Sequence, residues 1–118
     1  MKKISVLIPC YNEEENVAAF QQAVIAAFQG CGYSYEIIFV DDGSSDGTLS
    51  VIKNIAAKDE KVHYIVFSRN FGKEAGMYAG LSEARGDYCV IMDADLQHPP
   101  ELLPEMYRRV RSLSLIHI

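Results

Sequence analysis

Four short apolar segments, separated by stretches with helical spacing, constrain the fold of this chain most strongly. They lie at Ile4–Ile8, Glu36–Val40, His63–Phe67 and Tyr88–Met92. Each is rich in β-branched or aromatic residues and shows little polar alternation, which is typical of parallel strands covered on both faces. The sequence therefore predicts buried strands within an α/β domain.

The first stretch between these segments predicts a helix from Glu13 to about Gln29. Its apolar residues recur with 3.6-residue spacing and form one mostly apolar stripe. Asn12 is the expected N-cap, and the three glutamates at 13–15 suit the positive end of the helix. Gly30 and Gly32 are expected to end it.

Three further helices are predicted by the same kind of spacing. They run from about Gly47 to Lys58, capped by Ser45 or Asp46, from about Lys73 to Ala84, and from Pro99 or Pro100 onward. The resulting order β-α-β-α-β-α-β-α predicts an open, mostly parallel α/β sheet with right-handed crossovers.

The bulk properties fit one packed domain and exclude some partners. The chain has 118 residues, 49% of them hydrophobic, and a formal net charge of −5. The negative charge argues against general binding to nucleic acid. Three cysteines without C-x-x-C spacing suit a reducing compartment better than a disulfide framework. No apolar run approaches the length of a membrane span.

The ligands of such sheets bind at the carboxyl ends of the strands, so the residues that follow each strand are the candidates for function. Those segments are 9–13, 41–47, 68–73 and 93–97, and they hold most of the unusual chemistry of the chain. The sequence therefore predicts a functional site along one edge of the sheet.

Asp93 and Asp95 follow the fourth predicted strand. Alternate residues of an extended segment point to one side, so both carboxylates can face the same point. At about 4 Å they would repel by about 4 kcal/mol at an effective dielectric of ~20, unless a cation is bound between them or one of them stays protonated. With Gln97 as a further oxygen donor, the set suits Mg²⁺ or Mn²⁺. The alternative is that one aspartate caps the next turn while the other faces water.

Asp41 and Asp42 follow the second predicted strand. The Gly-Ser-Ser-Asp-Gly segment after them is typical of a turn with a helix cap, but that does not explain two consecutive aspartates at a strand end. A carboxylate there can accept a hydrogen bond from a base N–H or a ribose hydroxyl. We predict that Asp41 contacts a ligand, and Asp42 also.

Tyr11, Asn12 and Glu13 form the first turn from strand to helix. Tyr11 can lie along a base and Glu13 can reach a ribose hydroxyl. On this segment alone, the better interpretation is that Asn12 and Glu13 only cap the helix.

Arg69 and Lys73 bracket the third such turn. A cationic pair beside a helix N-terminus can neutralise a diphosphate. A solvated lysine and an arginine paired with some carboxylate are an equal alternative. His63 is expected at an edge or on the surface and is not assigned to catalysis.

Four motifs together resemble a known family. They are S-V-L-I-P-C-Y-N-E-E-E-N, V-D-D-G-S-S-D-G-T, S-R-N-F-G-K-E-A-G and D-A-D-L-Q-H-P-P-E, in the order of the family 2 glycosyltransferases of the GT-A fold. The resemblance runs from about Ile4 to Val110 and is greatest to polyprenyl-phosphate sugar transferases, including bactoprenol glucosyltransferases and dolichyl-phosphate mannose synthases.

The resemblance implies a role for each of the candidate residues. The nucleoside would be held by Pro9, Tyr11, Glu13 and Asp41. Asp93 and Asp95 would bind the metal and diphosphate, Gln97 would complete the metal shell, and Arg69 and Lys73 would lie near the diphosphate. The run N-F-G-K-E-A favours UDP-glucose as the donor, with GDP-mannose as an alternative.

The implied reaction is metal-dependent, inverting transfer of the sugar to a polyprenyl phosphate in cell envelope biosynthesis. A lipid monophosphate is already largely anionic near neutral pH, with a second pKa of about 6, so it needs little help from a general base. No general base is identified in the chain. The expected location is cytoplasmic, at the cytoplasmic face of the inner membrane for a membrane-associated full-length parent.

Members of the family continue well beyond the length of this chain. Residues 113–118 also resemble the translated end of a transposon adapter. We therefore expect residues 1–111 to be an incomplete nucleotide-sugar-binding domain and residues 112–118 to be a non-native tail.

Two other functions compete with this prediction. One is a non-catalytic fragment that binds the nucleotide without transferring sugar. The other is a phospho-receiver signalling domain, in which paired acids follow the first strand, whereas here Pro9-Cys10-Tyr11 stand at that position.

Overall fold

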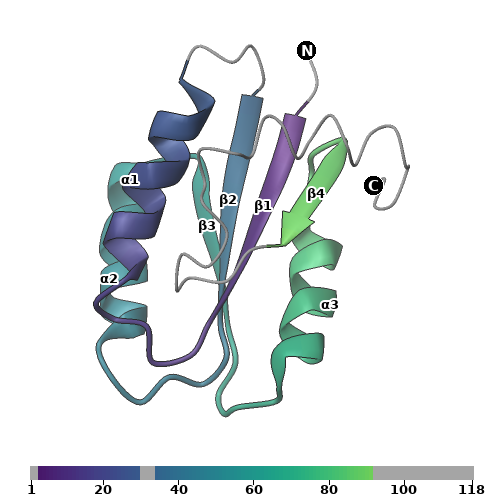
Figure 1. Ribbon diagram of the computed structural model, residues 1–118. Helices are drawn as coiled ribbons and strands as arrows, with labels where there is room; N and C mark the ends of the chain where they lie inside the picture. The colour runs from purple at the N-terminus through teal and green to yellow at the C-terminus, as the bar shows by residue number, and fades with distance from the viewer. Residues whose placement is uncertain (1–2, 30–33, 92–118) are drawn as a thin grey trace.

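The computed structural model describes residues 3–29 and 34–91 and shows alternating strands and helices (Figure 1). The elements are β1 (Lys3–Cys10), α1 (Val17–Phe28), β2 (Ser34–Asp41), α2 (Thr48–Lys58), β3 (Val62–Val66), α3 (Lys73–Glu83) and β4 (Tyr88–Ile91). The predicted order of strands and helices is confirmed over this part of the chain. The fourth predicted helix, Met92, Gly30 and Gly32 lie outside the described residues.

The four strands form one sheet in the order β3-β2-β1-β4, and every pairing in it is parallel. β1 and β2 are paired in register along their whole lengths, from Lys3 beside Ser34 to Cys10 beside Asp41. The predicted parallel α/β sheet is therefore confirmed, with β1 and β2 at its centre and β3 as one of its edges.

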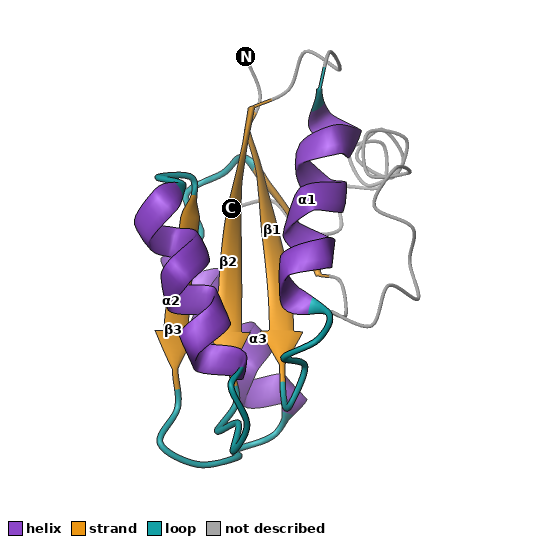
Figure 2. Cartoon of the chain, turned by 90° about the vertical axis from the view of Figure 1, so that its left-hand side faces the viewer, coloured by secondary structure: helices purple, strands orange, loops and turns teal. Residues whose placement is uncertain are grey.

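Helices cover both faces of the sheet. α1 and α2 lie on one face and α3 lies on the other (Figures 1 and 2). The first face packs Ile4, Val6, Ile8, Ile37 and Phe39 with Val17, Phe20, Val24 and Ile52 of the helices. The second packs Leu7, Ile38, Val40 and Cys89 with Ala84 and the half-buried Leu81. Burial on both faces explains why the strand sequences lack polar alternation.

The predicted start of the first helix was wrong. α1 begins at Val17, Asn16 is its N-cap, and no acidic residue lies in its first turn. Asn12 has a positive φ of 54°, in the left-handed region where asparagine is tolerated better than most residues. The segment before Val17 is not helical because the amides of Asn12, Glu13 and Glu14 donate to side chains of the next loop, those of Ser44, Thr48 and Asp46.

The start of the second helix agrees more closely with the sequence. Gly47 is the N-cap of α2, and the preceding Asp46 accepts a hydrogen bond from the Thr48 amide at 2.9 Å. The Thr48 hydroxyl also donates to Asp46, and these bonds hold the pKa of Asp46 below its ordinary value. The predicted cap at Ser45 or Asp46 was therefore wrong in position, because Gly47 is the N-cap, although the Asp46 carboxylate binds the first amide of the helix.

A buried carboxylate ties the amino ends of the strands to the turn between α3 and β4. Glu36 is 2% exposed and accepts hydrogen bonds from the Ser5 hydroxyl and the Arg85 amide, both at 2.6 Å. Lys3 Nζ and His63 Nε2 lie 3.8 Å from its other oxygen. The His63 side chain is 56% exposed on edge strand β3, which confirms its expected place.

We expect Gly86→Ala to disturb the contacts around Glu36 and so to lower the stability of the fold. A Cβ at Gly86 would lie 2.6 Å from Ser5 Oγ and 2.8 Å from the Lys3 carbonyl oxygen, so backbone has to move. Urea denaturation should show a loss of about 1–3 kcal/mol, as overpacking usually costs. Gly76→Ala in α3 is the matched control, because its nearest contact is a side-chain carbon of Val40 at 3.3 Å. Equal stability of the two variants would contradict this expectation.

The buried thiol of Cys89 gives the stability of the fold a dependence on alkaline pH. Burial, with a smaller effect of the Glu36 charge, raises the pKa of Cys89 from 9.0 to about 12. The pKa of the thiol is higher in the folded chain than in the unfolded chain. The stability that the buried, protonated thiol contributes is therefore fully present below the unfolded-state pKa and is lost as the pH rises toward the folded-state pKa.

Between about pH 8 and pH 10, the wild-type chain should therefore lose roughly 1 kcal/mol more stability than Cys89→Ala, which has no thiol to titrate. Urea denaturation at the two pH values measures both losses. Parallel pH profiles for the two proteins would show that the thiol does not contribute.

Candidate functional site

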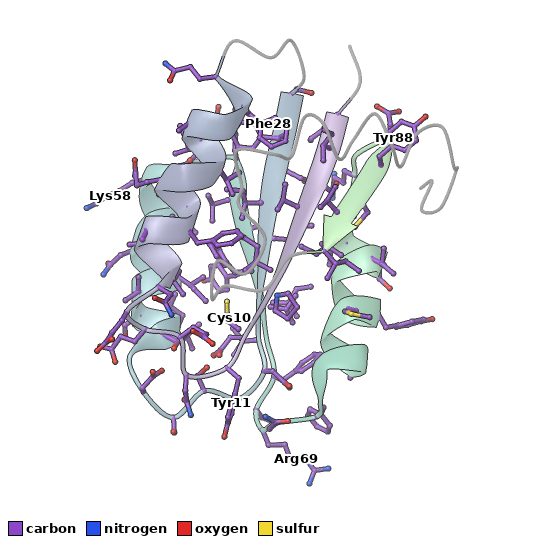
Figure 3. The ribbon with its side chains drawn as sticks, in the orientation of Figure 1. Cys10, Tyr11, Phe28, Lys58, Arg69 and Tyr88 are labelled. Atoms are coloured by element: carbon purple, nitrogen blue, oxygen red, sulfur yellow. The ribbon has the colours of Figure 1, made fainter. Side chains whose placement is uncertain are left out.

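The loops after β1, β2 and β3 gather at one end of the sheet. In Figure 3, Tyr11 and Arg69 lie at this end, whereas Phe28 and Tyr88 lie toward the other. Parallel pairing places the carboxyl ends of the strands together, which is the usual position of ligand sites in α/β sheets. The structure therefore brings together the first three of the four predicted segments.

Side chains join the first of these loops to the second. Asn12 donates its amide to Ser44 Oγ at 2.9 Å and accepts the Ser45 amide on its side-chain oxygen at 2.8 Å. The Glu13 amide donates to Thr48 Oγ1 at 2.9 Å. The Asn12 carboxamide is thus engaged between two loops and does not cap a helix.

Glu14 adds a further bond between the same two loops, since its carboxylate accepts the Gly47 amide at 3.0 Å. Sequence spacing gave no indication of these partners, because they are separated by more than 30 residues along the chain. They became visible only once the two loops were placed side by side.

Three predicted ligand contacts lie at the first strand end. Pro9 is half-buried in β1 beside Val40, and Tyr11 is 48% exposed just after the strand. The Glu13 carboxylate accepts a hydrogen bond from the Asn16 side chain at 2.9 Å and is half-buried. Tyr11 therefore offers an accessible ring, while the nucleoside contacts of all three residues remain predictions.

Asp41 ends β2 and is only 2% exposed. Its Oδ1 accepts the Ser44 amide at 3.2 Å, and the other carboxylate oxygen has no hydrogen-bond partner among residues 3–29 and 34–91. A buried carboxylate oxygen without a partner is costly, so a ligand N–H or O–H would stabilise it. The contact between Asp41 and a ligand stays a prediction.

The charge of Asp41 also acts on Cys10, its neighbour in register on β1. Burial raises the pKa of the Cys10 thiol, and the negative charges of Asp41 and Glu13 raise it further. At neutral pH the buried Cys10 side chain is therefore a thiol. Because the thiolate is the reactive form, Cys10 is not expected to act as a nucleophile.

Asp42 has a structural role that its sequence position did not reveal. It is 6% exposed, and its two oxygens accept the amides of Phe71 and Gly72 at 2.8 and 3.0 Å. These bonds fix the loop between β3 and α3. A direct contact between Asp42 and a ligand stays a prediction.

The cations predicted near a diphosphate lie on that same loop. Arg69 is exposed, its guanidinium carbon is 4.7 Å from the centre of the Phe71 ring, and it has no ion pair within the described part of the chain. The alternative that Arg69 pairs with a carboxylate is therefore not seen among the described residues. Lys73 is the first residue of α3, and its side chain lies outside the described set.

The predicted metal ligands Asp93, Asp95 and Gln97 lie outside the described residues, and the described ranges contain no other group of three acidic, histidine or cysteine side chains placed to hold a metal. β4 runs parallel to β1 and points toward the end of the sheet that holds Asp41, although its last residue, Ile91, pairs with Leu7, three residues before the end of β1. The oxygen donors predicted after it suit a hard divalent cation. The metal site stays a prediction.

Solved structures share the fold of this chain. A mannosyltransferase from Pyrobaculum calidifontis, PcManGT, in complex with GDP-Man and Mn²⁺, superposes with a TM-score of 0.80 at 23% identity. The match covers 92% of this chain and 32% of that one. S. aureus TarS 1-349 in complex with UDP-GlcNAc gives 0.75 at 22% identity, covering 93% and 31%. These likenesses show the GT-A fold.

Curated relatives have higher sequence identity. The chain is 49% identical over 105 residues to CsbB of Bacillus subtilis (strain 168), covering 89% of this chain and 32% of that protein. It is 41% identical over 107 residues to the prophage bactoprenol glucosyl transferase homolog of Escherichia coli (strain K12), covering 91% and 35%. The chain therefore spans about a third of the length of these relatives.

Residues 5–115 also match the sequence model of a protein family, Glycosyl transferase family 2. That range includes every candidate residue of the site and all of the described strands and helices apart from the first two residues of β1. The chain belongs to glycosyl transferase family 2.

Proposed function

We propose that this chain binds the sugar nucleotide in an enzyme that transfers the sugar to a polyprenyl phosphate. The single observation that carries the proposal is the buried Asp41 carboxylate, whose second oxygen lacks a partner in the described part of the chain, at the edge that also holds Tyr11 and Arg69. That edge can accept a hydrogen bond, provide an aromatic face and supply a positive charge. A nucleoside diphosphate has a partner for each of them, in its base or ribose, its base and its diphosphate.

The proposed donor is UDP-glucose, with GDP-mannose as the alternative. The name of the Escherichia coli relative specifies glucosyl transfer to bactoprenol. Another relative, from Pseudomonas fluorescens (strain SBW25), is an undecaprenyl-phosphate 4-deoxy-4-formamido-L-arabinose transferase and is 40% identical over 87% of this chain and 30% of that protein. Both names specify a polyprenyl acceptor, which supports a polyprenyl phosphate here.

The residues of this chain would act mainly by binding and orienting the donor. Asp41 would accept an N–H of the base or a hydroxyl of the ribose, Tyr11 would lie along the base, and Arg69 would offset the charge of the diphosphate. A divalent cation held by Asp93, Asp95 and Gln97 would supply charge stabilisation to the leaving diphosphate.

The proposed chemistry is an inverting displacement. An oxygen of the acceptor phosphate forms a bond to the anomeric carbon, and the bond from that carbon to the diphosphate oxygen breaks, with the electron pair leaving on the nucleoside diphosphate. Because the phosphate is already anionic near neutral pH, no proton has to be removed first. This reaction would take place at the cytoplasmic face of a membrane that holds the lipid.

No helix in the described part of the chain is long and apolar enough to cross a membrane. The membrane association proposed for a full-length parent therefore rests on the polyprenyl acceptor.

Thermal unfolding with UDP and Mn²⁺ tests nucleotide binding. At about 100 times Kd, the ligands should add about 2.7 kcal/mol to the stability of the chain, which corresponds to a rise of several degrees in Tm. Asp95→Ala should abolish the rise through loss of the cation, and Asp41→Ala should reduce it through loss of the hydrogen bond.

Asp59→Asn is the matched control for these variants. Asp59 follows α2 and accepts the Lys61 amide, so its loss should lower Tm without changing the effect of UDP. A wild-type Tm that neither UDP nor GDP raises, with or without Mn²⁺, would contradict the proposal.

Transfer of labelled glucose from UDP-glucose to undecaprenyl phosphate tests the reaction itself. A labelled lipid product would show that this chain is sufficient for catalysis. UDP binding without a product would favour the alternative of a nucleotide-binding fragment, because the chain spans only about a third of its relatives.

A further inference from the structure

A buried carboxylate at the end of β2 accepts two hydrogen bonds from the loop between β3 and α3. Asp42 is 6% exposed and accepts the Phe71 amide on one oxygen and the Gly72 amide on the other. Hydrogen bonds to an ionised acceptor are stronger than those between neutral groups. Two consecutive amides are therefore fixed relative to the end of β2.

Backbone geometry restricts the same loop on two sides. Gly72 has a φ of 98°, a conformation that favours glycine, and it is the N-cap of α3. Gly43 approaches the loop so closely that a Cβ there would collide with the Arg69 carbonyl carbon and the Asn70 nitrogen. The loop thus has little freedom to shift relative to Asp42 and Gly43.

The Arg69 guanidinium depends on this fixed loop for its position. It lies over the Phe71 ring, at 4.7 Å from the ring centre, and Phe71 in turn packs edge-on against Phe67 at 5.5 Å. Within residues 3–29 and 34–91, no carboxylate forms an ion pair with Arg69. Its position is therefore set by Phe71, whose amide Asp42 holds.

We infer that Asp42 is a positioning residue, which holds the Phe71 and Gly72 amides and so places the Arg69 guanidinium against the diphosphate of the sugar nucleotide. The inference rests on the proposed function for the identity of the ligand. It assigns Asp42 an effect through the loop, in place of direct contact with the ligand. Removal of a negative charge near a diphosphate would by itself strengthen binding, so weaker binding after Asp42→Asn is informative.

A double-mutant cycle on UDP affinity tests this inference. Arg69→Met should weaken UDP binding by about tenfold through loss of a charge-assisted contact, and Asp42→Asn should weaken it by about three- to tenfold. If Asp42 acts through Arg69, the double variant should bind no more weakly than Arg69→Met alone, within about twofold. Losses that multiply, or unchanged affinity in Asp42→Asn, would overturn the inference.

Asp59→Asn serves as the matched control of the cycle. Asp59 also holds a loop, through the Lys61 amide at 3.0 Å and the Gln21 side chain at 3.2 Å, but it lies before β3, at the opposite end of the sheet. The Asp59→Asn variant should bind UDP with the same affinity as the wild-type chain. Equal weakening in Asp59→Asn and Asp42→Asn would mean that general loosening of the fold explains both effects, and would overturn the inference.

Phe71→Leu covers the case in which Asp42→Asn does not fold. Phe71 is half exposed, so its replacement should leave the core intact while removing the ring under Arg69. We expect UDP binding to weaken by about threefold through loss of the cation–π contact, and by no further factor in combination with Arg69→Met. Full affinity in Phe71→Leu would count against the proposed placement of Arg69.

Hydrogen exchange of the Phe71 and Gly72 amides gives a test that requires no nucleotide. The Phe71 amide should exchange at least about tenfold faster in Asp42→Asn than in the wild-type chain, whereas amides of β1 should not change. The Gly72 amide should accelerate less, because it also donates to Asn70 Oδ1 at 3.0 Å. Unchanged exchange would overturn the inference. If these amides exchange faster in Asp42→Asn but the wild-type chain fails to bind UDP, the result would support the role of Asp42 in fixing the loop and would contradict the proposed function.

Discussion

The in-register parallel pairing of β1 with β2 is the constraint on which the rest of the structure depends. It aligns eight residue pairs and ends with Cys10 beside Asp41, so the first two loops start at the same level. Because both strands are covered on two faces, a shift of one residue would exchange the residues of the two cores. The hydrophobic effect that fixes the register therefore also fixes the site.

The loops that follow β1, β2 and β3 are held together by hydrogen bonds between side chains and backbone amides. Asn12, Glu14 and Thr48 join the first loop to the second, and Asp42 joins the second to the third. Each bond satisfies a polar group that a turn would otherwise leave open. The result is a connected set of loops, in which Asp41 keeps one carboxylate oxygen without a partner in the described part of the chain and Arg69 is unpaired there.

The sequence indicated the candidate residues better than it indicated their roles. Asp41 and Arg69 were expected at one sheet edge and lie there, because strand ends in a parallel sheet can be located from hydrophobic runs alone. The N-cap predicted at Asn12 was wrong, and the support of the third loop by Asp42 was not foreseen. In both cases a partner about 30 residues away outweighs the local preference, and local patterns carry no information about such a partner.

Local sequence alone determined the alternation of strands and helices, the parallel sheet and the edge at which polar groups collect. Side-chain periodicity and strand burial depend on neighbouring residues, which is why these features could be predicted. Tertiary structure decided which polar groups are used within the protein and which remain for a ligand. Asp41 and Asp42 are adjacent, yet one has an oxygen without a protein partner in the described residues and the other holds two amides. That difference arises only when the third loop is packed against the end of β2.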